Sequence, residues 1–278
     1  MEAVIFATAP DLAEDQVATS MRVLAGAAIM TAAMLSAAPA AACKDDVERV
    51  IQDDEQPERL DWKLARAFNN RCAASLNKGG YDRALADCNQ ALRYDPKHAI
   101  AFNNRGLAYA GKGDLNRATE DYDEAIRLDP HLTIARYNRA DAFEKKSQYD
   151  RALADYDEII RTQTADARAW NNRCWTRAIA GQLESALADC SESLRLKPDS
   201  ANALDSRGLA HLKLGDLDHS VADYDAALQI NPQLATSLYG RGVAKRKRGD
   251  RAGADADIAA AQAIEPNIVE EFARYGAR

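Results

Sequence analysis

The chain has 278 residues, of which 28% are charged and 47% hydrophobic, and its formal net charge at pH 7 is -7. This charge argues against nucleic acid as the main partner, because phosphate binding needs a basic surface or a concentrated basic stripe. The one basic run, residues 245–248, ends an expected helix, where the helix dipole favours cations, and is interpreted as solvated surface.

Residues 1–43 are predicted to be a leader. From Met21 the chain has one basic residue, Arg22, then an apolar stretch to Leu35 and small residues that suit signal-peptidase cleavage. The residues before Met21 are acidic and include no basic one, so Met21 is the expected true start. The apolar stretch is too short for a stable membrane span, and an uncleaved N-terminal anchor is the alternative. We therefore expect a periplasmic or secreted protein, with a cytoplasmic location as the alternative.

Cys43 follows three alanines at the end of this leader. Loss on cleavage, a free thiol and lipidation are the alternatives for it. Residues 44–64 are expected to form a flanking helix or a linker before the repeats.

Residues 65–268 consist of one 34-residue unit repeated six times without a gap. A unit of this length cannot bury its own apolar face, so neighbouring units must stack to share a core. The sequence therefore predicts an all-α solenoid of helix-turn-helix repeats, with the units 65–98, 99–132, 133–166, 167–200, 201–234 and 235–268.

Two breaks define the helices of each unit. Position 15 is glycine, the residue that favours a left-handed helix end, in every unit except the third, which has Ser147. Position 32 is proline, which stops the second helix, except at Thr164. After the last unit, residues 269–278 are predicted to form a C-terminal capping helix, because Ile268, Phe272 and Tyr275 share one helical face.

The unit resembles the tetratricopeptide repeat (TPR) family, and the leader makes the chain similar to exported bacterial members. The residues that carry the resemblance are a large apolar residue at position 4, a small residue at position 20 and an aromatic residue at position 24, as in Tyr122, Tyr156 and Tyr224. The resemblance implies a right-handed superhelical solenoid. It also implies a concave groove, lined by the first helices, that binds an extended peptide or a partner protein.

Mapped onto this chain, the resemblance and the recurring polar positions give a predicted groove set: Asn69, Asn70, Asn103, Asn104, Tyr137, Asn138, Asn171, Asn172, Trp175 and Tyr239. Asparagine offers a donor and an acceptor to a peptide backbone, and aromatic rings offer flat contact area. The alternative is a merely hydrated strip. The carboxylate clamp of chaperone-tail binders is incomplete, because Asn69 and Ala73 stand where that branch has lysine and asparagine.

Position 7 is arginine and position 23 aspartate in all six units. Both lie beside helix-packing positions, where an unpaired charge is costly to bury. We expect a ladder of Arg–Asp pairs, within units or between neighbours, that sets the stacking register. Charges on a solvated face are the alternative.

Four of the five cysteines occupy positions 8 and 24 of two units, as Cys72 with Cys88 and Cys174 with Cys190. Where position 24 is tyrosine, position 8 is glycine or alanine, so the cysteine pairs replace one packing contact as a unit. We predict two disulfides, which need an oxidising compartment. Reduced, buried thiols are the alternative.

No pattern for catalysis, a cofactor or a metal is found. The four histidines, His98, His131, His211 and His219, stand at no recognised metal-ligand spacing and are interpreted as structural or solvated. We therefore expect a protein-interaction scaffold and not an enzyme. A cytosolic adaptor resembling a co-chaperone and an enzyme-associated subunit are the alternatives.

Overall fold

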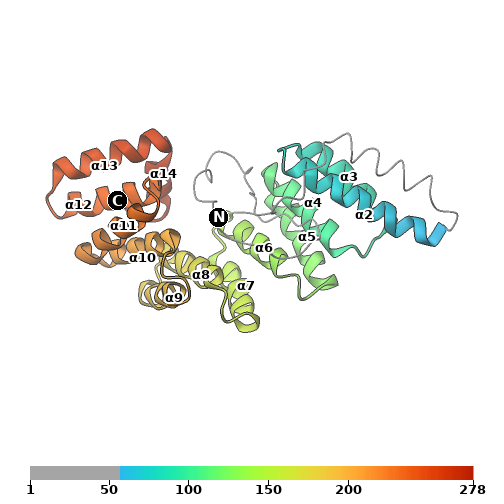
Figure 1. The fold of residues 1–278 in the computed structure, drawn as a ribbon, viewed down its shortest axis with the longest axis horizontal. Helices are drawn as coiled ribbons and strands as arrows, with labels where there is room; N and C mark the ends of the chain where they lie inside the picture. Colours follow the sequence, from blue (N-terminus) through green and yellow to red (C-terminus); the bar gives the residue numbers. More distant parts are fainter. Residues whose placement is uncertain (1–56, 278) are drawn as a thin grey trace. The chain divides into compact units, whose positions relative to one another are not determined.

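The structure is a computed structural model that describes residues 57–277, and over these residues every regular element is a helix (Figure 1). The helices are α2 (Pro57–Leu76), α3 (Tyr81–Tyr94), α4 (Ala99–Gly111), α5 (Leu115–Leu128), α6 (Thr133–Lys145), α7 (Tyr149–Thr162), α8 (Ala167–Ala180), α9 (Leu183–Leu196), α10 (Ala201–Leu214), α11 (Leu217–Ile230), α12 (Ala235–Lys247), α13 (Arg251–Ile264) and α14 (Ile268–Arg274). The predicted leader and Cys43 lie outside the described residues. Within residues 57–277, no helix combines the length and the apolar composition that crossing a bilayer requires.

The helices follow the 34-residue period. α2 pairs with α3, α4 with α5, α8 with α9, α10 with α11, and α12 with α13. The first helix begins earlier than the repeat does, because α2 starts at Pro57 while the first unit starts at Ala65. The end of the predicted flanking segment, residues 44–64, is therefore part of the first hairpin.

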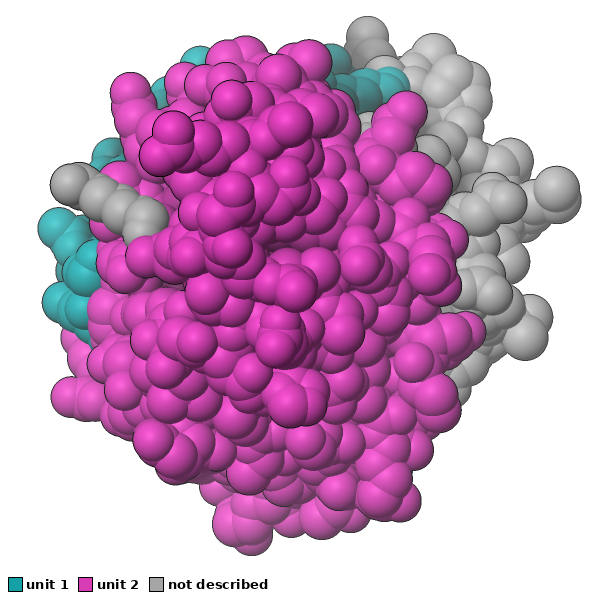
Figure 2. Space-filling model, turned by 90° about the vertical axis from the view of Figure 1, so that its left-hand side faces the viewer, with its two compact units in different colours: residues 1–148 teal, residues 149–278 magenta. Residues whose placement is uncertain are grey.

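The chain divides into two compact units, unit 1 (residues 1–148) and unit 2 (residues 149–278), which Figure 2 colours separately. In unit 1, α4 packs against α2 and α3, and α5 packs against α6. In unit 2, α10 packs against α8, α9 and α12. In each unit the first helix of a hairpin therefore packs against both helices of the preceding hairpin, which confirms the predicted all-α repeat solenoid.

The turn inside a hairpin needs one residue with a left-handed backbone. Gly113 has φ +81°, a conformation that costs glycine little because it has no Cβ atom. Ser147, the exception in the sequence, keeps the same turn with φ +56°, and it alone among the described non-glycine residues has a positive φ. The third repeat thus keeps its break at the cost of local backbone strain.

Tyrosines at position 24 fill the space left by small residues at position 8. A Cβ atom on Gly106 would lie 2.6 Å from Cε1 of Tyr122, and one on Gly208 would lie 2.9 Å from Cε1 of Tyr224. Both tyrosines are buried. This confirms that a small residue makes room for the facing ring.

The two cysteine pairs occupy the same packing positions. The sulfur atoms of Cys72 and Cys88 lie at disulfide-bonding distance, and so do those of Cys174 and Cys190. The Cα atoms are 5.4 Å and 5.3 Å apart, which is within the range that a disulfide requires. Each pair can therefore join the two helices of its hairpin without backbone movement.

Arginines at position 7 pair with aspartates at position 23 of the same hairpin. Arg105 Nε donates to Asp121 Oδ2 over 2.8 Å, and its Nη2 donates to Oδ1 over 2.7 Å. The third repeat is divided, with Arg139 in unit 1 and Asp155 in unit 2. The same two bonds occur in the other four repeats, at Arg71 and Asp87, Arg173 and Asp189, Arg207 and Asp223, and Arg241 and Asp257.

A further nitrogen of these arginines connects successive hairpins. Arg105 Nη1 donates to Asn89 Oδ1, at position 25 of the preceding repeat, over 2.9 Å. The predicted ladder is therefore present, and it runs both within hairpins and between them. The equivalent bonds, each of 2.7 Å, join Arg139 to Asp123, Arg173 to Asp157, and Arg241 to Asp225.

The environment of the aspartate differs along this ladder. Burial raises the pKa of Asp121 above its ordinary value, although Arg105 favours the charged form. Burial also acts on Asp257, but hydrogen bonds from Arg241 and Lys245 outweigh it, so the pKa of Asp257 is lowered. A second cation, with Lys245 Nζ 2.8 Å from Asp257 Oδ2, thus further favours the charged form of the last aspartate.

Candidate protein-binding surface

The predicted groove residues lie on the first helix of each hairpin. In unit 1 these helices are α2, α4 and α6, and in unit 2 they are α8, α10 and α12. Within each unit neighbouring first helices pack against one another. We call the side chains at positions 5, 6 and 9 of these helices the first-helix face, and describe it separately for each unit.

In unit 1 four asparagines of this face form a chain of hydrogen bonds. Asn104 Nδ2 donates to Asn69 Oδ1 over 3.0 Å, and Asn138 Nδ2 donates to Asn103 Oδ1 over 2.8 Å. Asn103 Nδ2 closes the chain by donating to Asn104 Oδ1 over 3.3 Å. All four side chains are buried. The amides therefore link three successive first helices, a structural role that the sequence analysis did not assign to them.

The other two predicted groove residues of unit 1, Tyr137 and Asn70, differ in exposure. Tyr137 is buried, whereas Asn70 is exposed. Position 6 is buried in the next two repeats, at Asn104 and Asn138, whose helices pack on a preceding hairpin, whereas the described helices that α2 contacts are α3 and α4, which follow it. The structure thus brings Asn69, Asn103, Asn104 and Asn138 together and leaves Asn70 on the surface.

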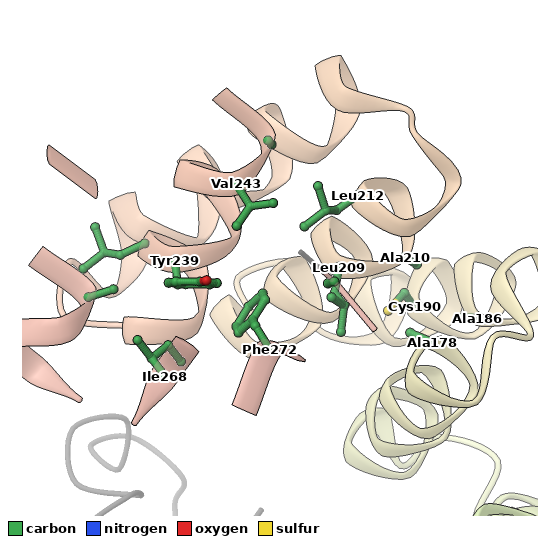
Figure 3. Close-up of a cluster of buried hydrophobic side chains, with 14 of the residues drawn as sticks. Ala178, Ala186, Cys190, Leu209, Ala210, Leu212, Tyr239, Val243, Ile268 and Phe272 are labelled. Atoms are coloured by element: carbon green, nitrogen blue, oxygen red, sulfur yellow. The ribbon is translucent and has the colours of Figure 1, made fainter. Parts of the chain in front are cut away.

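In unit 2 the C-terminal helix α14 packs on the first-helix face. Phe272 contacts Tyr239 of α12 with ring centroids 4.7 Å apart, and Figure 3 shows Phe272 between Tyr239 and Leu209. Tyr275 reaches back to Trp175 of α8, with centroids 5.0 Å apart. A C-terminal helix is present as predicted, although α14 spans Ile268–Arg274 and not 269–278. Phe272 of this helix and Tyr275 just after it cover two of the predicted groove residues.

Lys213 holds the end of this segment in place. Its Nζ atom donates to the backbone oxygens of Ala178 and Tyr275, each over 2.7 Å, and to that of Ile179 over 3.2 Å. Burial lowers the pKa of Lys213. The ammonium group thus satisfies carbonyls at the C-terminal end of α8 and just after α14, a role for which position 13 carried no sequence signal.

Asn171 and Asn172 of α8 are half-buried, and so is Trp175 one turn further on. The Asn171 Oδ1 atom is buried and has no hydrogen-bond partner in the described part of the chain. Its counterpart in the second repeat, Asn103 Oδ1, accepts from Asn138. In the fifth repeat the position of Asn138 is taken by Ser206. Its hydroxyl donates to the backbone oxygen of Asn202 over 2.9 Å and not to Asn171.

An unsatisfied buried acceptor costs roughly 1–3 kcal/mol, so it is uncommon without a reason. Asn171 Oδ1 therefore offers a hydrogen-bond site that the described chain does not use. It lies on the same helix face as Trp175, which is the arrangement that a peptide backbone with an adjacent apolar side chain would fit.

Stacked helix hairpins of this period define a helical-repeat protein of the scaffold class. Residues 74–132 and 137–201 match a family model described as "Tetratricopeptide repeat", and residues 208–249 match one described as "TPR repeat". The chain belongs to the tetratricopeptide repeat family. Comparison with curated protein sequences gives no match.

Several solved structures share the fold at low identity. A tetratricopeptide repeat protein from Parabacteroides merdae is 19% identical, with 77% of this chain and 90% of that one covered and a TM-score of 0.63. The pilF protein of Pseudomonas aeruginosa is 19% identical, with 76% and 97% covered and a TM-score of 0.62. PilW, whose structure is described as that of a type IV pilus biogenesis factor, is 19% identical, with 79% and 100% covered and a TM-score of 0.63. At these identities the likeness shows the fold alone.

Family and fold together support a protein–protein interaction scaffold, and repeat folds of this kind are typically non-enzymatic. A protein is the kind of partner that the family indicates. The residues that contact such a partner are a separate question, because a fold shared by many functions does not specify its ligand.

Proposed function

We propose that this scaffold binds an extended peptide segment of a partner protein along α8 of unit 2. The observation that carries the proposal is the buried, unpartnered Asn171 Oδ1 atom. The half-buried Asn171 side chain would turn outward so that a backbone N–H of the bound segment donates to Oδ1, and an apolar side chain of the segment would pack on the exposed part of Trp175. The buried asparagine chain of unit 1 supports the stacking of the first helices, and Asn70, which is not part of that chain, stays on the surface of unit 1.

We further propose that the protein is exported and acts in a bacterial periplasm. The support is the predicted leader together with two cysteine pairs placed at disulfide-bonding distance. Two such pairs are unexpected in a reducing cytosol. Cell fractionation of the native host tests this location, and a chain that stays in the cytosolic fraction with residues 1–43 intact would favour the cytosolic adaptor instead.

The binding site is tested by crosslinking capture from the native host envelope, comparing the wild type with Asn171→Ala. We expect the variant to lose a specific captured protein while its melting temperature stays at the wild-type value or rises, because an unsatisfied acceptor has been removed. Asn77→Ala is the matched control, since Asn77 is an exposed asparagine beyond the end of α2. The same captured set for wild type and Asn171→Ala would refute the site.

A further inference from the structure

A pocket lies in unit 2 where the fourth and fifth repeats meet. Its volume is about 480 Å³, and it is lined by Leu187, Ser191, Arg207, His211, His219, Ala222 and Asp223. Ser191 is at position 25 of its repeat. At the other described joints between repeats this position is asparagine or aspartate, and it accepts a hydrogen bond from the position 7 arginine of the next repeat. The Ser191 hydroxyl donates to the backbone oxygen of Leu187 over 2.7 Å. The short side chain therefore leaves space beside Arg207 that an amide or a carboxylate fills at the equivalent joints.

Two histidines and one aspartate gather beside this pocket. Asp216 precedes α11 and caps it, His219 lies in the first turn of α11, and His211 lies in the last turn of α10. One ligand atom from each of the three side chains lies within 4.8 Å of the other two. The imidazole rings of His211 and His219 stack with centroids 5.2 Å apart. The hairpin turn thus brings together histidines that the sequence analysis treated as isolated.

One separation within the cluster suits a shared ion, and another is a hydrogen bond that the ion would replace. His219 Nδ1 hydrogen-bonds to Asp216, 2.8 Å from Oδ2 and 2.9 Å from Oδ1, whereas His211 Nδ1 is 3.2 Å from the same Oδ2. His211 Nδ1 is nevertheless a buried atom without a hydrogen bond, because its contact with Asp216 is close but not aligned. Two ligands bound tetrahedrally to one zinc ion at about 2.0–2.1 Å lie about 3.3 Å apart. The contact between His211 and Asp216 is close to that value.

The neighbouring repeats show that His211 is directed away from the ladder. Its counterparts at position 11 contact the ladder aspartates directly, with Arg177 2.6 Å from Asp189 and Lys245 2.8 Å from Asp257. His211 Nε2 is 3.9 Å from Asp223, and its other nitrogen faces Asp216. At 3.9 Å Asp223 makes no hydrogen bond to this ring, so the Nδ1 side of His211, which faces Asp216, is the side available to an ion.

We propose that His211, Asp216 and His219 bind one divalent transition-metal ion of the zinc class. Two imidazoles with one carboxylate favour such ions over Mg²⁺ or Ca²⁺, which prefer oxygen ligands. The charged groups around the site are Asp216, Asp223 and Arg207, and Arg207 is held by its two bonds to Asp223. Three protein ligands leave a coordination position open for water or a donor group of a partner. This site does not depend on the peptide site at Asn171.

The test is a zinc titration of the purified full chain, freed of metal, in competition with a chromogenic chelator. We expect the wild type to bind one Zn²⁺ per chain and His219→Ala to bind it at least about tenfold more weakly. His219 suits this test because its side chain is 73% exposed, so its removal should leave the fold intact. Asp216→Asn should also weaken binding, while the asparagine still caps α11.

The matched control is His131→Ala, which removes an exposed histidine from a turn between repeats and should leave the affinity unchanged. The apo forms of all variants should share the circular dichroism spectrum of the wild type. Co²⁺ provides a second readout, because the wild type should give the visible absorption of a tetrahedral ion and His219→Ala should not. Equal zinc binding by wild type and His219→Ala, or no binding by the wild type, would overturn the proposal.

Discussion

Tyr275 packs edge to face against Trp175, with ring centroids 5.0 Å apart, although the two residues belong to the C-terminal segment and the fourth repeat. α14 contacts α12 and α13, as a helix that caps the last hairpin does. The chain just after it reaches further across the first-helix face of unit 2, where Lys213 donates both to the backbone oxygen of Tyr275 and to that of Ala178 in α8. Part of the surface that the resemblance assigned to a ligand is therefore covered by the protein itself.

Replacing Phe272 by alanine tests this packing. The ring is 1% exposed, so Phe272→Ala should lower the free energy of unfolding by about 3 kcal/mol, as measured by urea denaturation. Val269→Ala changes a residue of the same helix that is 40% exposed and should cost less than about 0.5 kcal/mol. Equal losses in the two variants would show that α14 does not pack through Phe272.

The Arg–Asp ladder predicts that two similar arginine substitutions lower the free energy of unfolding, measured by urea denaturation, by very different amounts. Arg105→Gln leaves the buried carboxylate of Asp121 without its cation and should cost about 3 kcal/mol. Arg127→Gln breaks an equally paired but exposed contact with Glu124 and should cost less than about 0.5 kcal/mol. Adding Asp121→Asn to Arg105→Gln should restore part of the loss, because no buried charge remains. A double variant no more stable than Arg105→Gln would count against the pairing.

Because Ser147 has a positive φ, we predict that replacing it by glycine stabilises the protein. Ser147→Gly removes the strain of a positive φ and should raise the free energy of unfolding by about 0.5–1 kcal/mol in urea denaturation. The reciprocal change, Gly113→Ser, introduces a side chain at φ +81° with open space around it and should cost a similar amount. If Ser147→Gly were neutral while Gly113→Ser destabilised, the serine would be supported by contacts other than the turn.

The two cysteine pairs are predicted to form disulfides, which reduction would break. Alkylation of the unreduced protein should therefore leave these four cysteines unlabelled, and alkylation after reduction should label all four, as measured by intact mass. Because each pair is separated by 16 residues, loss of one bridge should cost about 3 kcal/mol on the chain-entropy estimate, and Cys72→Ala with Cys88→Ala measures it in urea. Alkylation of all four cysteines in the unreduced native protein would contradict the prediction.

His98 predicts a pH dependence of stability. Burial lowers the pKa of His98 below its ordinary 6.5, although Asp95 acts in the opposite direction. The unfolded chain therefore takes up this proton first, so stability is fully present above pH 6.5 and is lost as the pH falls toward the folded-state pKa. His98→Gln should reduce the difference in melting temperature between about pH 7.5 and about pH 5.5. His131→Gln, an exposed histidine in the next turn, should leave that difference unchanged.

The repeated features of this protein were determined by the sequence alone. The period of 34 residues predicted the hairpins, glycine and proline predicted their ends, and the recurrence of arginine and aspartate predicted the ladder. These features are readable because a contact between stacked identical units has the same sequence offset in every copy. Six copies turn a weak preference at one position into a pattern.

The partners of individual side chains were decided by the tertiary structure. Asn104 bonds Asn69 and Asn138 bonds Asn103 at the same offset of 35 residues, yet these asparagines were expected to face a ligand, because an amide suits either partner. Other contacts occur only once. Trp175 was expected to be open, yet Tyr275 lies against it, and His211 meets His219 only because one hairpin turn folds them together. Such contacts have no repeated offset to reveal them, since each depends on where a helix end or a single substitution such as Ser191 places its neighbours in space.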